Sequence, residues 1–165
     1  MSTATATKTE LQGKLDARIL LRTVEEGYGP GAWHGNDLKA ALADVSSEAA
    51  FWRPAPGRHN IAEIALHHAY CIRNVRAQIT GGKPDAFVME GEDWFDLPGE
   101  SKLSWAKVKS TLEKEQQKLT AAFAALGGGK SASATPEQFD LALGITCHAI
   151  YHAGQVQLLK ALRGT

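Results

Sequence analysis

A stripe of residues near the end of the chain follows the inward face of a helix in a bundle. Along it the spacings alternate between four and three, a pattern typical of a helix that faces a bundle core. The residues are Leu141, Ile145, His148, His152, Gln155, Leu159 and Leu162. The ends of the stripe are aliphatic but the centre is polar, and an unsatisfied polar group in a core costs about 1–3 kcal/mol. The stripe therefore predicts a helical bundle with a shared polar site midway along one helix.

Helical periodicity and capping signals predict long helices elsewhere in the chain as well. The expected ranges are about Thr9 to Glu26, with Leu15, Ile19, Leu20 and Val24 as apolar face; Ile61 to Thr80 after an Asn60 cap; Ser101 to Leu126; and Pro136 to Leu162 after a Thr135 cap. A shorter segment is expected after a cap at Asn36. This pattern predicts an all-α protein, a four-helix bundle in a single domain over residues 1–165, with residues 1–8 as a frayed terminus.

The connection between the second and third expected helices is unusually long. Residues 81–100 contain two prolines and a run of acids around Trp94 and Phe95. A connection of this length tends to be a crossover or a functional loop, and it would allow the two helices to run parallel. Trp94 and Phe95 are interpreted either as a lid over the polar site or as ordinary aromatic packing of the loop.

Composition and charge exclude several classes of protein. The formal net charge is +0, which gives no electrostatic reason to expect nucleic acid or an anionic membrane as partner. No apolar run approaches the roughly 18 residues of a spanning helix. The first residues lack an apolar core and an arginine-rich pattern, so no targeting segment is expected. Cys71 and Cys147 are then expected to be free thiols in a reducing cytoplasm.

The pair His148 and His152 is spaced to hold a metal ion. Residues at i and i+4 of a helix have Cβ atoms about 5–6 Å apart, and two imidazoles so placed can bind one ion at about 2.0–2.1 Å if it is zinc. The alternative is a pair of core histidines satisfied by backbone or water. A third ligand would come from a facing helix, where His67 and His68 are candidates. Periodicity points His68 inward slightly better and does not choose between them.

Three further side chains belong to the same hypothesis. Gln155 would orient His152 or a metal-bound water, or else bond a neighbouring helix. Glu63 is a candidate base or outer partner of the site, although a capping box with Asn60 explains it without catalysis. Cys71, one turn after His67, is an alternative ligand, with a buried inert thiol as the default interpretation.

Two segments resemble the DinB/YfiT-like superfamily of metalloenzymes. "HNIAEIALHHAY" is similar to the first motif of that family, and "HAIYHAGQVQLLK" is similar to the second, more specific one. The matching residues are Asn60, Ile61, Glu63 and His67 in the first, and His148, His152, Gly154 and Gln155 in the second. Residues 32–42 and 53–61 also resemble one branch of the family. His68 departs from the aliphatic residue that is usual at its position.

The resemblance implies a function as well as a fold. It implies a DinB-like four-helix bundle in which His67, His148 and His152 hold one divalent ion, zinc or nickel, since imidazole suits both. It implies that homodimers are common and that some relatives are thiol-dependent S-transferases or isomerases. A metal-dependent transferase or hydrolase that activates a low-molecular-weight thiol or water is therefore expected. The alternative is a non-catalytic metal-binding or stress-response module with a structural or sensory ion.

Overall fold

The protein is predominantly helical. The computed structural model describes residues 13–29, 31–128 and 133–164. Their elements are β1 (Leu15–Asp16), α1 (Ala17–Tyr28), α2 (Leu38–Leu42), α3 (Ser47–Phe51), α4 (Ile61–Thr80), α5 (Trp105–Gly127), β2 (Ser133–Ala134) and α6 (Pro136–Arg163). No helix among these residues is both long and apolar enough to cross a membrane.

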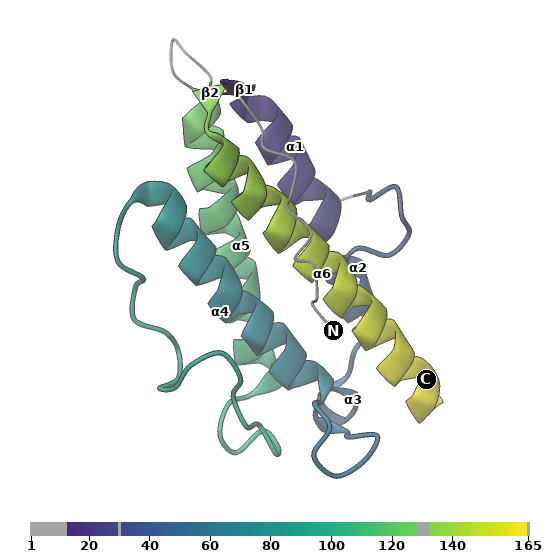
Figure 1. Ribbon diagram of the computed structural model, residues 1–165. Helices are drawn as coiled ribbons and strands as arrows, with labels where there is room; N and C mark the ends of the chain where they lie inside the picture. The colour runs from purple at the N-terminus through teal and green to yellow at the C-terminus, as the bar shows by residue number, and fades with distance from the viewer. Residues whose placement is uncertain (1–12, 30, 129–132, 165) are drawn as a thin grey trace, which may run out of the picture.

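The four longer helices surround one apolar core. α4 packs against α5 and α6, and α1 packs against the same two helices from the other side. Figure 1 shows α1 and α6 running in one direction and α4 and α5 in the other, so α4 and α5 are parallel. The core between them includes Leu20, Ile72, Leu112 and Phe123, each fully buried or nearly so. The antiparallel pair of β1 and β2 joins the N-terminal ends of α1 and α6.

The first helix begins later than its periodicity predicts. Leu15 pairs with Ala134 in the small sheet, and the Asp16 carboxylate caps α1 by accepting from the Arg18 backbone N–H at 2.9 Å. The expected start at Thr9, like the expected frayed terminus, lies outside the described residues. Ile19, expected on the apolar face, is 57% exposed, because Ala17, Leu20 and Val24 form the buried face and Ile19 lies off it.

Other boundaries differ because local caps decide them. Asp37 rather than Asn36 caps α2, with its carboxylate accepting from the Ala40 N–H at 2.8 Å. The helix α3, which the sequence did not predict, begins after a Ser46 cap. Ser104 caps α5, so that helix begins at Trp105 and not at Ser101. Leu162, expected in the stripe, is exposed where the last turn of α6 extends beyond its neighbours (Figure 1).

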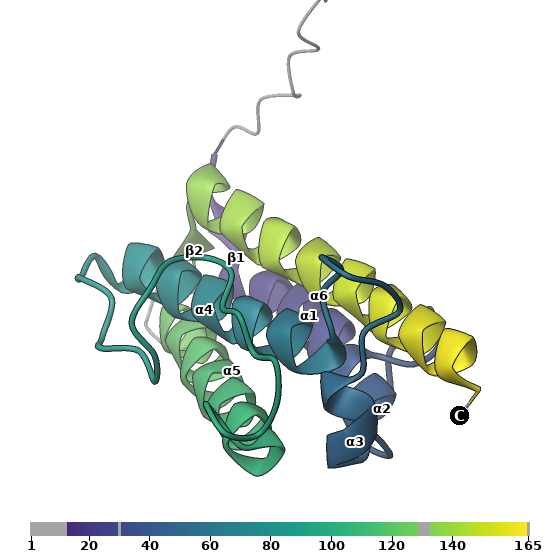
Figure 2. The ribbon, with the colours of Figure 1, turned by 90° about the horizontal axis from the view of Figure 1, so that it is seen from below.

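The connection between α4 and α5 folds back along α4. Residues 81–104 hold no helix or strand, and their contacts follow α4 in reverse order. Asp85 pairs with Arg76, the Asp93 backbone oxygen lies 3.0 Å from His67 Nδ1, and the Leu97 N–H donates to Glu63. Figure 2 shows this connection beside α4 and α5. The loop is thereby fixed against the middle of α4, where the histidines lie.

A close contact between α1 and α6 fixes the position of α6 along its axis. A Cβ added at Gly27 would lie 3.0 Å from the backbone oxygen of Thr146 and 3.1 Å from Cβ of Ala149. The Thr146 hydroxyl also donates to the backbone oxygen of Thr23 at 3.0 Å. Because only glycine permits this spacing, the α1–α6 contact fixes the turn of α6 that carries His148.

Candidate metal centre

The structure brings the histidines of α4 and α6 together. Nε2 of His148 lies 3.1 Å from Nε2 of His67 and 3.0 Å from Nε2 of His152. His68 meets the other side of the same ring, with its Nδ1 2.8 Å from Nδ1 of His148. Two nitrogens bound to one tetrahedral zinc at about 2.0–2.1 Å lie roughly 3.3 Å apart. The spacing of the Nε2 atoms is therefore close to that of two ligands on a common ion.

Hydrogen bonds behind two of these rings indicate where their protons lie. Nδ1 of His67 faces the Asp93 backbone oxygen at 3.0 Å and its carboxylate at 3.1 Å, and Nδ1 of His152 faces Oε1 of Gln155 at 2.6 Å. These oxygens only accept, so both Nδ1 atoms carry a proton, and in the neutral form of each ring the lone pair is on Nε2. Both lone pairs face Nε2 of His148, which holds at most one hydrogen. The donor set therefore fits a metal cation, which accepts several lone pairs at one point.

The surroundings keep the rings of His68, His148 and His152 neutral, the form in which imidazole binds a metal. Burial, followed by the neighbouring His152 and His67, lowers the pKa of His148 to about 4. Burial likewise lowers the pKa of His152 to about 4, although its hydrogen bond to Gln155 opposes this. Burial is also the main reason that the pKa of His68 lies well below its ordinary value. Each of these groups is uncharged at neutral pH.

Asp93 and Trp94 cover the His67 side of the cluster. Asp93 has a φ of 60°, a left-handed conformation that is uncommon for residues other than glycine. This turn aims its backbone oxygen at His67 and places the indole of Trp94 flat on the His67 ring, with centroids 3.9 Å apart. The other face of Trp94 stacks on His59 at 3.8 Å. Each of the two interpretations of this loop holds for one residue. Trp94 covers the cluster, whereas Phe95 packs in the core against Tyr70 and Phe87.

Cys71 joins the cluster from the next turn of α4. His67, Cys71 and His148 each offer a ligand atom, and these atoms lie within 4.8 Å of one another, so this group can hold a metal ion. The thiol sulfur is 3.8 Å from Nε2 of His67. Burial, followed by the charge of Asp93, raises the pKa of Cys71 to about 11, so the sulfur is a protonated thiol at neutral pH.

Glu63 and Gln155 have different surroundings. Gln155 lies directly behind His152, and its amide nitrogen donates to the Tyr151 hydroxyl. Glu63 completes the capping box with Asn60 and is 2% exposed. Its carboxylate accepts hydrogen bonds from Arg53, from His59 and from the Leu97 N–H, which ties two loops to the start of α4. Glu63 therefore fixes the loop that carries Asp93 and Trp94.

Sequence reasoning did not single out Asp93 or Arg53. Asp93 is one of several acids in the long connection, and its role depends on a backbone turn that no periodicity reveals. The sequence did offer one signal for Asp93. It belongs to an acidic and aromatic run in a loop that is too long for a simple connection. Arg53 gave no signal, because it lies in a loop outside any helical period and its partner Glu63 was already explained as a cap.

Comparison with known proteins identifies the family of the chain. No curated protein and no solved structure matches the chain. The model of the DinB superfamily matches residues 32–156, which include His67, His68, His148 and His152. This match spans well over half of the chain and both histidine motifs, and the chain therefore belongs to the DinB superfamily.

Proposed function

We propose that this protein binds one divalent ion, zinc or nickel, through His67, His148 and His152, and that it is a metal-dependent enzyme. The observation that carries the proposal is the convergence of the His67 and His152 lone pairs on Nε2 of His148. In this interpretation the four longer helices form the four-helix bundle of the DinB kind. Three neutral nitrogen ligands leave positions open for water or substrate, as in catalytic sites.

The reaction class that we propose is transfer of a low-molecular-weight thiol, with hydrolysis as the related possibility. When bound, a divalent ion supplies Lewis acidity that lowers the pKa of a thiol or water beside it. The residues of the chain prepare the site for this. Asp93 and Gln155 hold the rings of His67 and His152 in the tautomer that offers Nε2, and Trp94 limits the access of water from the loop side.

Cobalt substitution tests whether the ion is open to thiols. Addition of 2-mercaptoethanol to the Co²⁺-loaded protein should produce a new thiolate-to-cobalt charge-transfer band in the near ultraviolet. The Cys71→Ser variant is the matched control, because a band from the protein's own thiol would disappear in it. If no band forms with added thiol in either protein, the thiol-transfer proposal is wrong.

The alternative function, a structural or sensory ion in a non-catalytic module, has one observation in its favour. His152 is 2% exposed and His67 is 6% exposed, so little of either side chain is open to solvent. Removal of the ion by a chelator distinguishes the two. A structural ion is needed for folding, so helical circular dichroism would be lost, whereas an enzyme of the proposed kind should keep a folded apo-protein.

Two variants separate His67 from His68 as the ligand from α4. His67→Ala should weaken metal binding by at least 10–100-fold, because the loss of a residue that only hydrogen-bonds to a ligand already weakens it by that factor. His68→Ala should leave the metal content nearly unchanged and cost about 0.5–3 kcal/mol of stability. Metal content after dialysis and thermal unfolding measure the two effects. Reversed effects would assign the role to His68, and full metal content in both variants would point to Cys71.

We also propose that the protein is a homodimer. The proposal rests on the family resemblance and on exposed apolar side chains along one face of α6, namely Leu143, Tyr151, Leu158 and Leu162. Cys147 is exposed on the same face. Light scattering at micromolar concentration should give about twice 17.7 kDa, and Leu158→Arg should shift the protein to the monomer. A monomeric wild-type protein would contradict the proposal.

A further inference from the structure

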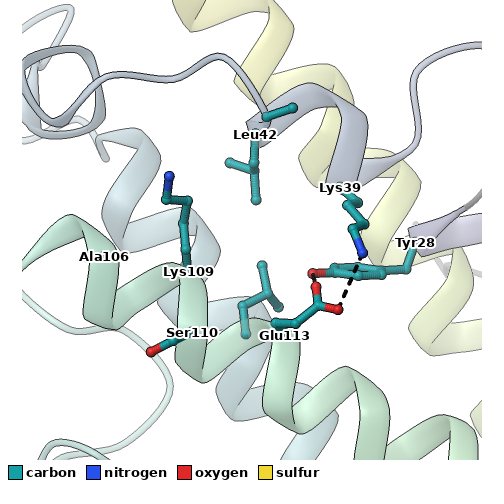
Figure 3. A pocket seen from close by; sticks show the side chains of 9 residues that line it. Tyr28, Lys39, Leu42, Ala106, Lys109, Ser110 and Glu113 are labelled. Atoms are coloured by element: carbon teal, nitrogen blue, oxygen red, sulfur yellow. Dashed lines mark hydrogen bonds and ion pairs between the residues drawn. The ribbon is translucent and has the colours of Figure 1, made fainter.

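A hollow lies away from the histidine cluster, where the end of α1 and the helix α2 meet α5. Its volume is about 450 Å³, within the range of pockets that bind small molecules. It is lined by Tyr28, Lys39, Leu42, Ala43, Ala106, Lys109, Ser110, Leu112 and Glu113. None of these residues belongs to the candidate metal centre. Figure 3 shows Leu42 over the hollow, with Lys39 and Lys109 on opposite sides of it.

The walls of this hollow are apolar, and most of its polar groups are already paired. The Glu113 carboxylate accepts from the Tyr28 hydroxyl at 2.8 Å and from the Lys39 ammonium at 3.3 Å (Figure 3). The Ser110 hydroxyl donates to the backbone oxygen of Lys107. These pairs leave Glu113 with its charge compensated, and they leave neither the tyrosine nor the serine hydroxyl hydrogen free for a ligand.

Lys109 is the cation of the hollow that lacks an acidic partner. Among the described residues no carboxylate pairs with it, and its ammonium lies 5.4 Å from the centre of the Trp105 ring. Trp105 does not line the hollow, but it is buried and its indole N–H donates to the backbone oxygen of Val45, so the ring beside the Lys109 ammonium is held in place. The lining thus holds two lysines, Lys39 and Lys109, and one carboxylate, that of Glu113, which pairs with Lys39. This leaves one excess positive charge beside an apolar surface.

We propose that this hollow binds a small amphipathic carboxylate, an aliphatic or aromatic acid with one negative charge. Its apolar part would lie on Leu42, Ala43, Ala106 and Leu112, and its carboxylate would pair with Lys109. A cationic ligand would meet the excess positive charge of the site. A phosphate with several charges would find only one uncompensated ammonium, so the monoanion is the ligand that matches the lining.

Octanoate is a suitable probe, followed by NMR of alanine methyl groups in the full-length protein. Saturable shifts are expected at Ala43 and Ala106, and octanol, which has the same chain without the charge, should bind more weakly. Lys109→Glu should weaken octanoate binding by about tenfold or more, because it replaces attraction by repulsion. Lys109→Gln, which keeps a polar side chain of similar length, should give a smaller loss.

The matched control is Lys107→Glu, which makes the same change of charge on the exposed side of α5 outside the hollow. It should leave octanoate affinity within about twofold. Binding should also persist in His148→Ala, which separates this site from the metal centre. Equal affinity in wild type and Lys109→Glu, or methyl shifts that depend on protein concentration alone, would overturn the proposal. The second result would assign the hollow to contact between copies of the chain.

Discussion

Replacement of His148 by alanine should lower the affinity for zinc by at least about 100-fold while leaving the helices folded. Loss of a residue that only hydrogen-bonds to a ligand already lowers metal affinity 10–100-fold, so the loss of a ligand should lower it more. His148 is also the ring that both other ligands face. The change removes a half-buried side chain, so the cost in stability should be about 0.5–3 kcal/mol. Competition against a zinc-binding dye measures affinity, and circular dichroism checks the fold.

His34→Ala is the matched control for that variant. His34 lies in a loop, and its ring contacts only the backbone oxygen of Glu26 among the hydrogen bonds of the described residues. Its removal should leave zinc affinity unchanged within error. Similar losses in both variants would mean that zinc binds histidines without regard to the cluster, and the proposed centre would be wrong.

Replacement of Glu63 by glutamine should destabilise the protein by about 3 kcal/mol. Loss of one partner of a buried ion pair usually costs 3–5 kcal/mol, and the lower end applies because Arg53 is partly exposed. The glutamine amide would also place donors against the donors of Arg53 and of the Leu97 N–H. Urea unfolding at pH 7 measures the difference. The control is Glu48→Gln, whose exposed pair with Arg163 should contribute less than about 1 kcal/mol.

The pKa of Glu63 also predicts how the free energy of unfolding changes at acid pH. Burial alone would raise the pKa of Glu63, but hydrogen bonds from Arg53, the Leu97 N–H and His59 outweigh it and hold the pKa below its ordinary value of 4.5. A depressed folded-state pKa means that the stabilisation is complete above the unfolded pKa and is lost as pH falls through the folded pKa. The difference in unfolding free energy between wild type and Glu63→Gln should therefore shrink below about pH 4.5. A difference that is independent of pH would contradict this role of the charge.

The helices could be predicted from local signals, and the deviations have local causes. Asn60 with Glu63 marked the start of α4 correctly, because a capping box depends on residues three apart. Thr135 with Pro136 marked the start of α6, because a cap followed by proline at the first helical position is a signal of adjacent residues. Periodicity placed Leu15 on the first helix, which was wrong, since Leu15 pairs in the small sheet with Ala134, far along the chain. Ile19 was assigned to the wrong face because a short helix with several apolar residues has more than one plausible stripe.

The site was predictable in its residue types but not in its geometry. The His148 and His152 spacing indicated a polar centre, and both His67 and His68 proved to contact His148 through different nitrogens. Which nitrogen of each ring is free depends on Asp93 and Gln155, and the position of Asp93 depends on a left-handed turn in a long loop. Such contacts arise from tertiary packing between segments that are distant in the sequence, and no periodic pattern of residues reveals them.

The central claim is that the convergent histidines hold a divalent ion, and elemental analysis of the full-length protein purified without a histidine tag tests it most directly. We predict about one zinc or nickel ion per chain in the wild type, and little or none in His148→Ala after the same dialysis. A wild-type protein that contains no metal, and that takes up neither zinc nor nickel when these are added, would contradict the claim.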